Sequence, residues 1–397
     1  MLRQWEFQLP TRVEFGRGSL KKLGEVAGQF GPSALLVGYA DQAGLEETYA
    51  RAARLLAEAE ITVTDFFQIP TDPDADLAID GARKAAEAGA DVVVGLGGGS
   101  VIDAAKGIAA LARMGGNLWD YTGANPDSRP VTQSLPLVAV PTTAGTGTEV
   151  TAVAVFTHHG VGPVPEFPVK ASINGPAVRP EVALVDPDLA LGSPPRLTAA
   201  CGADALGHAI EASMSRRANP ISSLLAGRAV GLIVENLRRA VEHPDDPEPR
   251  GPLALAATLA GAAFSEAGVT MTHSVAQALG GVLHIPHGEG VAIGTPLNLR
   301  YNARCCVEQY GQLARECGIR ADSAEQQAEA FVDYIVELLR SVGLPDHVEV
   351  PDDALEDLPA KLARNAFVST LVPLKLNPRK IDEPTLAELL RDILGSG

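Results

Sequence analysis

The chain has 397 residues, 46% hydrophobic and 20% charged, a composition typical of a globular protein large enough for two domains. Its formal net charge of −17 argues against nucleic acid or an anionic membrane as the main partner, because both favour a basic surface. There is no apolar run near the roughly 18 residues of a membrane span, no signal-peptide core and no C-x-x-C pair among the four cysteines, so we expect a cytoplasmic protein.

The first half of the chain alternates short apolar runs with segments of helical periodicity. Runs rich in valine, leucine, isoleucine and aromatic residues predict strands at 33–39, 61–67, 90–98, 136–145 and about 182–186. Helical patterns predict helices near 44–59, 77–89 and 101–113. This alternation predicts a parallel sheet with helices on both faces.

After about residue 188 helical periodicity dominates. Helices are expected at 198–216, 220–242, 252–267, 270–280, 288–301, 306–317, 323–342 and 382–394. We therefore predict two domains, an α/β domain over 1–187 and an all-helical domain over 188–397.

A glycine-rich segment, GLGGGS, follows the strand expected at 90–98 and precedes a helix. Because glycine has no Cβ, the backbone N–H groups of Gly97, Gly98 and Gly99 can approach a pyrophosphate, and the helix N-terminus adds positive partial charge. Ser100 could cap this helix and donate its hydroxyl. The spacing is not G-x-G-x-x-G, because Ser100 takes the last glycine position. A tight turn without a ligand is the alternative.

A second segment, PTTAGTGTEVT (141–151), carries small hydroxyl side chains after another expected strand. Thr142, Thr143 and Thr146 suit contacts with phosphate or ribose. The alternative is that Thr148 or Glu149 simply organises the start of a helix. The segment alone does not separate the two.

Four residues in the second half form a candidate metal site. Asp204 and His208 are four apart and project from one face of the helix expected there, so both can reach one ion. His273 and His287 lie further along the chain. Three imidazoles and one carboxylate suit Fe²⁺ or Zn²⁺ better than Ca²⁺ or Mg²⁺. Alternatively, each of these histidines is a core residue without a metal. A further histidine, His158, is expected at the surface in a loop.

Long motifs in this order resemble those of the iron-dependent (group III) alcohol dehydrogenases, which are related in fold to glycerol dehydrogenase and dehydroquinate synthase. The motifs are GGGSVIDAAKGIA, PTTAGTGTEVT, LTAACGADALGHAIEASMSRRANP, IPHGEGVAI and NPRKIDEPTLAELL. The resemblance covers nearly the whole chain. It implies a Rossmann-like α/β domain, a helical domain and an active site in the cleft between them.

The resemblance also implies roles for individual residues. It implies metal ligation by Asp204, His208, His273 and His287. It implies contacts with the pyrophosphate of NAD or NADP from Gly97, Gly98, Gly99 and Ser100. It implies further cofactor contacts from Asp103, Thr142, Thr143 and Thr146, and a place near the ribose and substrate for Lys170.

Two positions depart from the pattern of this family. Gln277 stands where many members have a histidine one turn after the third ligand. Glutamine does not titrate, so a proton relay there would pass to water or another side chain, and Gln277 could contact substrate or nicotinamide instead. Tyr39 stands where members that prefer NAD often carry Asp, with Asp41 two residues later, so NAD and NADP both stay open.

The activity that the resemblance implies is hydride transfer between a primary alcohol or its aldehyde and NAD(P), with Fe²⁺ or Zn²⁺ as a Lewis acid, in a homodimer or larger assembly. One alternative is reduction of a specialised carbonyl compound, maleylacetate-like or a phosphonate aldehyde, for which Arg196, Arg216 and Arg217 could bind the anion. Another is a non-redox metal lyase or cyclase like dehydroquinate synthase. A third is a binder without catalysis.

Overall fold

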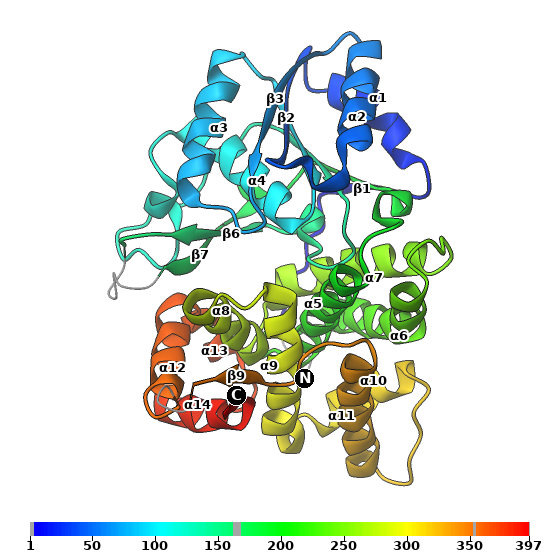
Figure 1. Cartoon of the computed structure of the whole chain (residues 1–397), viewed down its shortest axis with the longest axis vertical. Coiled ribbons are helices and arrows are strands. Elements are labelled where there is room, and N and C mark those ends of the chain that lie inside the picture. The colour runs from blue at the N-terminus through cyan, green and yellow to red at the C-terminus, as the bar shows by residue number, and fades with distance from the viewer. Residues whose placement is uncertain (1–3, 162–167, 352–354, 397) are drawn as a thin grey trace. The chain divides into compact units, whose positions relative to one another are not determined.

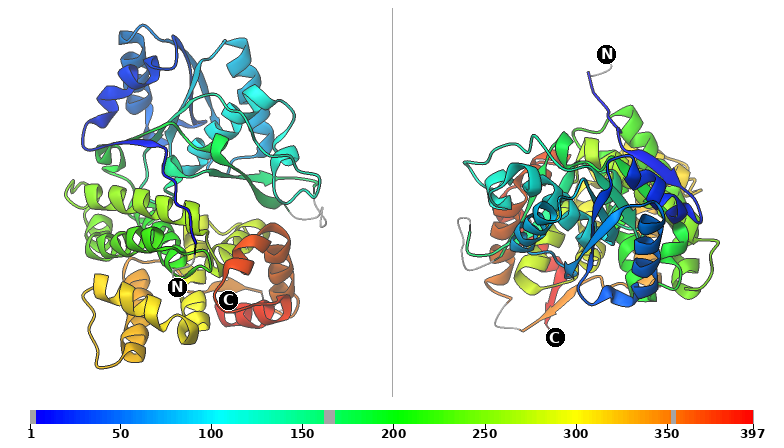
Figure 2. Two further views of the ribbon diagram at one scale, coloured as in Figure 1. Left: turned by 180° about the vertical axis from the view of Figure 1, so that it is seen from behind. Right: turned by 90° about the horizontal axis from the view of Figure 1, so that it is seen from above.

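A computed structural model describes residues 4–161, 168–351 and 355–396. The chain divides into two compact units (Figures 1 and 2). One is Leu9–Leu191, and the other is Gly192–Gly397 together with the residues up to Gln8.

The first unit is built on a six-stranded sheet in which every neighbouring pair is parallel, as predicted. The strand order is β1-β8-β5-β4-β2-β3. The strands are β1 (Arg12–Phe15), β2 (Ser33–Tyr39), β3 (Thr62–Ile69), β4 (Val92–Gly97), β5 (Leu137–Pro141) and β8 (Val182–Val185).

Helices cover both faces of this sheet (Figure 1). They are α1 (Leu23–Gly28), α2 (Glu46–Glu58), α3 (Ala75–Glu87) and α4 (Gly99–Met114). Successive side chains of a strand point to opposite faces. Leu35 and Val37 of β2 therefore pack with the apolar side chains of α3 and α4. Ala34 and Leu36, which alternate with them along the strand, pack with α1 and α2.

An antiparallel hairpin, β6 (Val153–His158) with β7 (Val169–Asn174), was not predicted from the sequence. Its inward side chains Phe156 and Ile173 join the core on the α3–α4 side of the sheet. The prediction that His158 lies at the surface is wrong. It ends β6, is 4% exposed, and its ring meets Trp119 edge-on at 5.2 Å between centroids.

Short 3₁₀ turns link these elements. They are η1 (Ser19–Lys22), η2 (Gln42–Gly44), η3 (Leu118–Tyr121), η4 (Thr148–Val150), η5 (Pro176–Val178) and η6 (Pro187–Ala190).

The second unit is helical, as predicted. Its helices are α5 (Pro195–Met214), α6 (Pro220–Glu242), α7 (Arg250–Ala267), α8 (Met271–Leu283), α9 (His287–Asn302), α10 (Val307–Glu316), α11 (Ala324–Ser341), α12 (Leu358–Ser369), α13 (Leu371–Leu376) and α14 (Glu383–Leu390). Two 3₁₀ turns, η7 (Ala303–Cys305) and η9 (Arg391–Ile393), and a short parallel pair, β9 (Val348–Val350) with β10 (Leu394–Ser396), complete it. Helix α5 packs against α6, α7 and α9, which places it inside the bundle.

Among the described residues, no single helix is both long and apolar enough to cross a membrane. Helices α7 and α8 satisfy that test only when taken together, by length and composition, and they are bent by 102° relative to each other.

Candidate functional site

Three helices of the second unit bring the four candidate metal ligands together. Asp204 and His208 lie one turn apart on α5, His273 lies in the first turn of α8, and His287 begins α9. The α5–α9 contact is close because glycines form it. A Cβ at Gly207 would lie 2.6 Å from Val291 Cγ1 of α9, and one at Gly288 only 2.4 Å from the Ala200 carbonyl of α5. A side chain at either position would push the two ligand-bearing helices apart.

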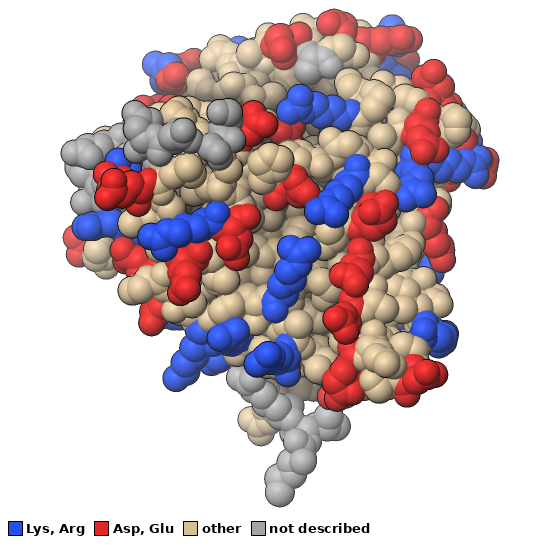
Figure 3. All heavy atoms as spheres, turned by 60° about the horizontal axis from the view of Figure 1, so that its bottom comes forward, with Lys and Arg blue, Asp and Glu red and all other residues tan. Residues whose placement is uncertain are grey.

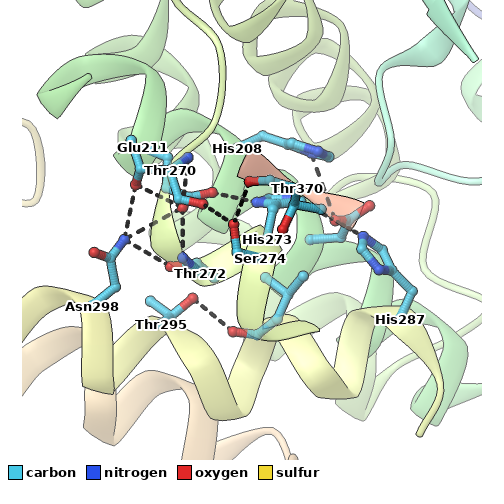
Figure 4. Close-up of polar contacts among 12 residues, drawn as sticks. His208, Glu211, Thr270, Thr272, His273, Ser274, His287, Thr295, Asn298 and Thr370 are labelled. Atoms are coloured by element: carbon cyan, nitrogen blue, oxygen red, sulfur yellow. Dashed lines mark hydrogen bonds and ion pairs between the residues drawn. The ribbon is translucent and has the colours of Figure 1, made fainter. Parts of the chain in front are cut away.

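Three of the donor atoms, on Asp204, His208 and His273, all lie within 4.8 Å of one another, as ligands of one ion would. The His287 donor approaches this group at Asp204. Asp204 Oδ1 lies 3.7 Å from His208 Nδ1, 3.4 Å from His273 Nε2 and 3.4 Å from His287 Nε2. These separations exceed those of hydrogen bonds. Tetrahedral ligands with metal bonds near 2.0–2.1 Å stand about 3.3 Å apart, which matches. Figure 4 shows the side chains of His208, His273 and His287 gathered in one region.

Burial supports a cation at this point. Asp204 is 4% and His273 is 3% exposed. Asp204 Oδ1 and His273 Nε2 nevertheless form no hydrogen bond of normal geometry within the described part of the chain. Buried polar atoms in native proteins almost always have a partner, and a divalent ion between these atoms would supply it. Burial alone would raise the pKa of Asp204, but the neighbouring histidines outweigh burial and hold the pKa well below its usual range. The carboxylate is therefore ionised.

The accessibility of the ligands differs. His208 is 5% exposed and its ring stacks on Phe264 and on His273, each at 4.2 Å between centroids. The side chain of His287 is 36% exposed. The donor set is thus enclosed on the α5 and α8 sides and open beside His287, as a catalytic metal site requires for entry of an exogenous ligand.

Glu211 was not singled out from the sequence, yet it contacts this centre directly. It follows His208 by three residues on α5 and is fully buried. One oxygen accepts hydrogen bonds from the backbone N–H groups of Thr270 (3.0 Å) and Thr272 (2.8 Å), and the other contacts His273 Nδ1. Burial would lower the pKa of His273, but the charge of Glu211, its contact with Nδ1 and the nearby carboxylate of Asp204 raise it to about 9.

The predicted phosphate-binding turn lies at the carboxyl end of β4 in the first unit. Strands β2 and β4 are neighbours, but the chain continues from β2 to β3 on one side and from β4 to β5 on the other. This is the topological switch point at which ligands bind in open α/β sheets. Tyr39 ends β2 and Gly97 ends β4, so both stand at this edge.

The structure brings most of the predicted cofactor residues of this unit together. A Cβ on Gly98 would lie 2.6 Å from Tyr39 Oη and 3.4 Å from Thr143 Oγ1. One on Gly99 would lie 2.4 Å from Thr146 Cγ2.

Backbone contacts join the same two segments. Thr142 donates its N–H to the Gly97 carbonyl over 2.9 Å, and a Cβ on Gly97 would lie 2.6 Å from Val101 Cγ2. The glycines are therefore required by close packing, and the backbone of the turn, next to the α4 N-terminus, is left without shielding side chains.

Buried Tyr49 ties the ends of β2 and β4 to each other. Its hydroxyl accepts the N–H of Tyr39 (2.9 Å) and donates to the Leu96 carbonyl (3.2 Å). Burial raises the pKa of Tyr49 to about 12, so the phenol stays neutral and keeps its donor proton.

Ser100 and Asp103 are both engaged with the protein. The prediction that Ser100 caps α4 is wrong, because Gly98 is the N-cap and the Ser100 hydroxyl donates to the Thr71 carbonyl. Asp103 accepts from Thr148 Oγ1 at 2.5 Å and from the Val155 N–H at 2.9 Å. It thereby links α4 to η4 and to the hairpin.

Lys106 reinforces that link. Its ammonium group is buried and donates to Thr148 Oγ1 (2.7 Å), Thr151 Oγ1 (3.0 Å) and the Val153 carbonyl (2.7 Å). Burial lowers its pKa to about 8, against the opposing charges of Asp103 and Glu149. A lysine in an apolar helix is normally taken for a solvent-facing residue, so the sequence carried no signal for this role.

Two further predicted site residues, Lys170 and Gln277, lie at the margins of the glycine-rich turn and of the candidate metal site, respectively. Lys170 on β7 forms an ion pair with Asp72, 2.8 Å between Nζ and Oδ2. Asp72 follows Thr71, whose carbonyl accepts a hydrogen bond from Ser100 in the first turn of α4. Through Asp72, Lys170 therefore lies near the start of α4. Gln277 is partly exposed, one turn after His273 on the same face of α8.

Comparisons with known proteins agree with this geometry. Residues 10–187 match the family described as iron-containing alcohol dehydrogenase, and residues 198–394 match the C-terminal part of the Fe-containing alcohol dehydrogenase family. The chain is 32% identical to the NAD-dependent methanol dehydrogenase of Bacillus methanolicus, over 98% of this chain and 99% of that protein. It is 34% identical to the 1,3-propanediol dehydrogenase of Citrobacter freundii, over 98% of both. The crystal structure of an archaeal halo-thermophilic Red Sea brine pool alcohol dehydrogenase superposes with a TM-score of 0.90, at 31% identity, covering 99% of this chain and 100% of that one.

Proposed function

The chain belongs to the iron-containing alcohol dehydrogenase family, and we propose that one Fe²⁺ ion and NAD serve its interconversion of a small primary alcohol and its aldehyde. It is a metal-dependent alcohol and aldehyde oxidoreductase. The observation that carries the proposal is the convergence of three imidazole nitrogens on Asp204 Oδ1 at 3.4–3.7 Å.

The residues of the second unit would hold the ion and leave one side open. Asp204 contributes the negative charge, and His208, His273 and His287 contribute neutral nitrogen donors. A divalent ion bound there supplies a Lewis acid for an alcohol or carbonyl oxygen, while NAD accepts or returns the hydride. The partly exposed His287 marks the side from which substrate reaches the centre. The enclosed ligands exclude water elsewhere.

The residues of the first unit would bind the cofactor. We propose that the backbone of Gly97–Gly99, at the N-terminus of α4, binds the pyrophosphate, and that Thr142, Thr143 and Thr146 contact it or the ribose. Tyr39 is the candidate for the adenosine ribose, because it ends the strand beside this turn. The domains over 1–187 and 188–397 would then bind cofactor and metal respectively.

Four residues have less direct support. Both Asp103 oxygens accept protein hydrogen bonds, from Thr148 and Val155, so we propose that Asp103 positions η4 and β6 beside the cofactor rather than binding the cofactor itself. Ser100 and Lys170 would act near the glycine-rich turn. Gln277 would contact substrate or nicotinamide through its amide, without moving a proton.

The substrate is proposed to be neutral rather than anionic. Arg196 Nε is paired with Glu289 at 2.6 Å, and the Arg216 guanidinium donates to the carbonyls of Asn377 and Pro378. These arginines already have partners, so they do not favour a maleylacetate-like or phosphonate substrate. A lyase reaction like that of dehydroquinate synthase differs in outcome, because it would leave no net NADH.

The experiment is a screen of Fe²⁺-loaded, anaerobically purified protein with primary alcohols and NAD or NADP, followed by NADH or NADPH absorbance. We expect NADH formation with 1-propanol-sized alcohols and its oxidation by the matching aldehydes. His273→Ala should lower kcat/KM more than roughly 100-fold, since it removes a ligand outright. His347→Ala is the matched control, because that imidazole is exposed and, among the described residues, pairs with Asp346 rather than with any candidate ligand. Equal activity of the two variants would refute the ligand assignment.

We also propose a homodimer or larger homo-oligomer in the cytoplasm, on the basis of the family resemblance. Light scattering of the purified protein tests the first part, since a monomeric mass would contradict it. Subcellular fractionation tests the second.

A further inference from the structure

Both carboxylate oxygens of Glu211 have defined partners. Its Oε1 accepts the N–H groups of Thr270 and Thr272 and the Thr270 hydroxyl (2.8 Å). These N–H groups belong to the start of α8, where backbone donors lack partners within the helix. A buried carboxylate at this point satisfies them and benefits from the helix dipole.

The polar cluster continues on α9 and fixes the orientation of this carboxylate. Asn298 Nδ2 donates to Thr272 Oγ1 (2.9 Å) and Thr270 Oγ1 (3.2 Å) and lies 3.4 Å from Glu211 Oε1. Figure 4 shows these side chains grouped on the side of Glu211 away from His287. The Oε1 side therefore faces donors only, and two of them are backbone groups that cannot rotate.

The other oxygen, Oε2, contacts His273 Nδ1. An ionised carboxylate can only accept hydrogen bonds, so Nδ1 must carry the proton. A divalent ion can bind Nε2 only after that nitrogen has lost its proton, and the imidazole is then neutral and protonated at Nδ1 alone. Nε2 lies 3.4 Å from Asp204 Oδ1, on the side of the candidate ligands.

We propose that Glu211 is a positioning residue that holds His273 in the tautomer protonated at Nδ1, so that Nε2 is free to bind the divalent ion. The proposal rests on the ligand set given under the proposed function. It adds a residue outside that set, which touches neither the ion nor the substrate.

The nearly isosteric variant Glu211→Gln makes the proposal testable. The amide oxygen must take the Oε1 position, because the Thr270 and Thr272 N–H groups require an acceptor. The amide NH₂ group then faces His273 Nδ1 and can only donate. His273 would move its proton to Nε2, and the nitrogen that should bind the ion would be blocked.

The measurement is Zn²⁺ affinity by chelator competition on variants whose folding is verified by circular dichroism. We expect Glu211→Gln to weaken binding roughly 10- to 100-fold, as losses of hydrogen-bond partners of metal ligands do. Glu289→Gln is the matched control. Glu289 is also buried and lies in the first turn of α9 after His287, but it pairs with Arg196 rather than with an imidazole. The Zn²⁺ affinity of Glu289→Gln should stay within about threefold of wild type, because this variant weakens the pair with Arg196 and removes a distant charge but leaves every imidazole contact in place.

A second measurement does not depend on the variant's folding. The ¹⁵N NMR spectrum of histidine-labelled, Zn²⁺-loaded wild-type protein should show a proton on Nδ1 of His273, with the signal assigned by its loss in His273→Ala. A proton on Nε2, or a folded Glu211→Gln protein with wild-type Zn²⁺ affinity, would overturn the proposal. Undiminished Zn²⁺ binding by His273→Ala would instead refute the ligand set itself, so the two failures are distinct.

Discussion

At the scale of single residues, the spacing of side chains along a helix made part of the candidate metal site predictable. Asp204 and His208 could be paired from the sequence because a separation of four places two side chains on one helix face. Glu211 continues the same face, seven residues after Asp204, and the pattern D-x₃-H-x₂-E is visible in retrospect. The sequence does not identify Glu211 as buried, because glutamate within a helix is normally exposed and only the tertiary contact with α8 buries it.

For Ser100 the sequence predicts a role, as a helix cap, that the structure does not show. Serine before a helix usually caps it, but the chain already enters the helix at Gly99, so the hydroxyl turns to the Thr71 carbonyl instead. The identity of a cap depends on where the first helical residue falls, and sequence patterns leave that boundary uncertain by one or two residues.

Gln277 leads to a prediction about pH dependence. The variant Gln277→His would place a titratable imidazole one turn after His273 on the same face of α8. We expect kcat/KM for alcohol oxidation to acquire an added inflection near pH 6.5, rising with pH as the imidazole loses its proton and can accept one. The pH profiles of wild type and variant, measured at equal metal content, test this. Superimposable profiles would contradict a place for Gln277 beside the substrate.

At the scale of elements, the long periodic helices and buried parallel strands were predictable, whereas short elements were not. Strands β6 and β7 form a hairpin through pairing with each other, and neither carries a long enough pattern to be recognised alone. Helices α12 and α13 were missed as well. The convergence of β2, β4 and β5 at one sheet edge depends on strand order, which periodicity does not encode.

The glycine turn after β4 gives a prediction for cofactor binding. In Gly99→Ala the new Cβ would meet Thr146 Cγ2 at 2.4 Å, so the two segments must separate. Overpacking of this kind costs about 1–3 kcal/mol, and we expect KM for NAD to rise about tenfold or more, with metal content unchanged.

Gly123→Ala is the control for that variant, because a Cβ at Gly123 meets nothing within 4 Å. Initial rates at varied NAD concentration separate the two. An unchanged KM in Gly99→Ala would show that the cofactor binds elsewhere.

The buried ammonium of Lys106 gives a prediction for stability. Its pKa falls from 10.5 to about 8 in the folded chain, chiefly through burial. Between pH 8 and 10.5 the unfolded chain binds this proton and the folded chain does not, so the contribution of Lys106 to stability rises with pH. At roughly 1.4 kcal/mol per pH unit, the rise approaches about 3 kcal/mol.

The measurement is the unfolding free energy of wild type minus that of Lys106→Met, from denaturant titrations between pH 7 and 10. We expect this difference to grow in favour of wild type as pH rises. A difference that is constant with pH would mean that the ammonium is not desolvated in the folded protein.

At the scale of the whole molecule, charge and composition limited the function without identifying it. The net charge of −17 argues against a polyanionic partner. The face drawn in Figure 3 carries acidic and basic side chains interspersed among neutral ones across the described residues. The activity instead follows from two local constellations, one per unit, and from membership of the family.

The central claim is that a single divalent ion, held by one carboxylate and three imidazoles, supports the dehydrogenase activity. Chelated protein titrated anaerobically with Fe²⁺, with NADH formation from a primary alcohol followed at each ratio of ion to chain, tests it most directly. We expect no activity without the ion, a linear rise with added Fe²⁺ and saturation at one ion per chain in wild type, and no rise in His273→Ala. Full activity of the chelated protein, or the same titration curve for His273→Ala, would contradict the claim.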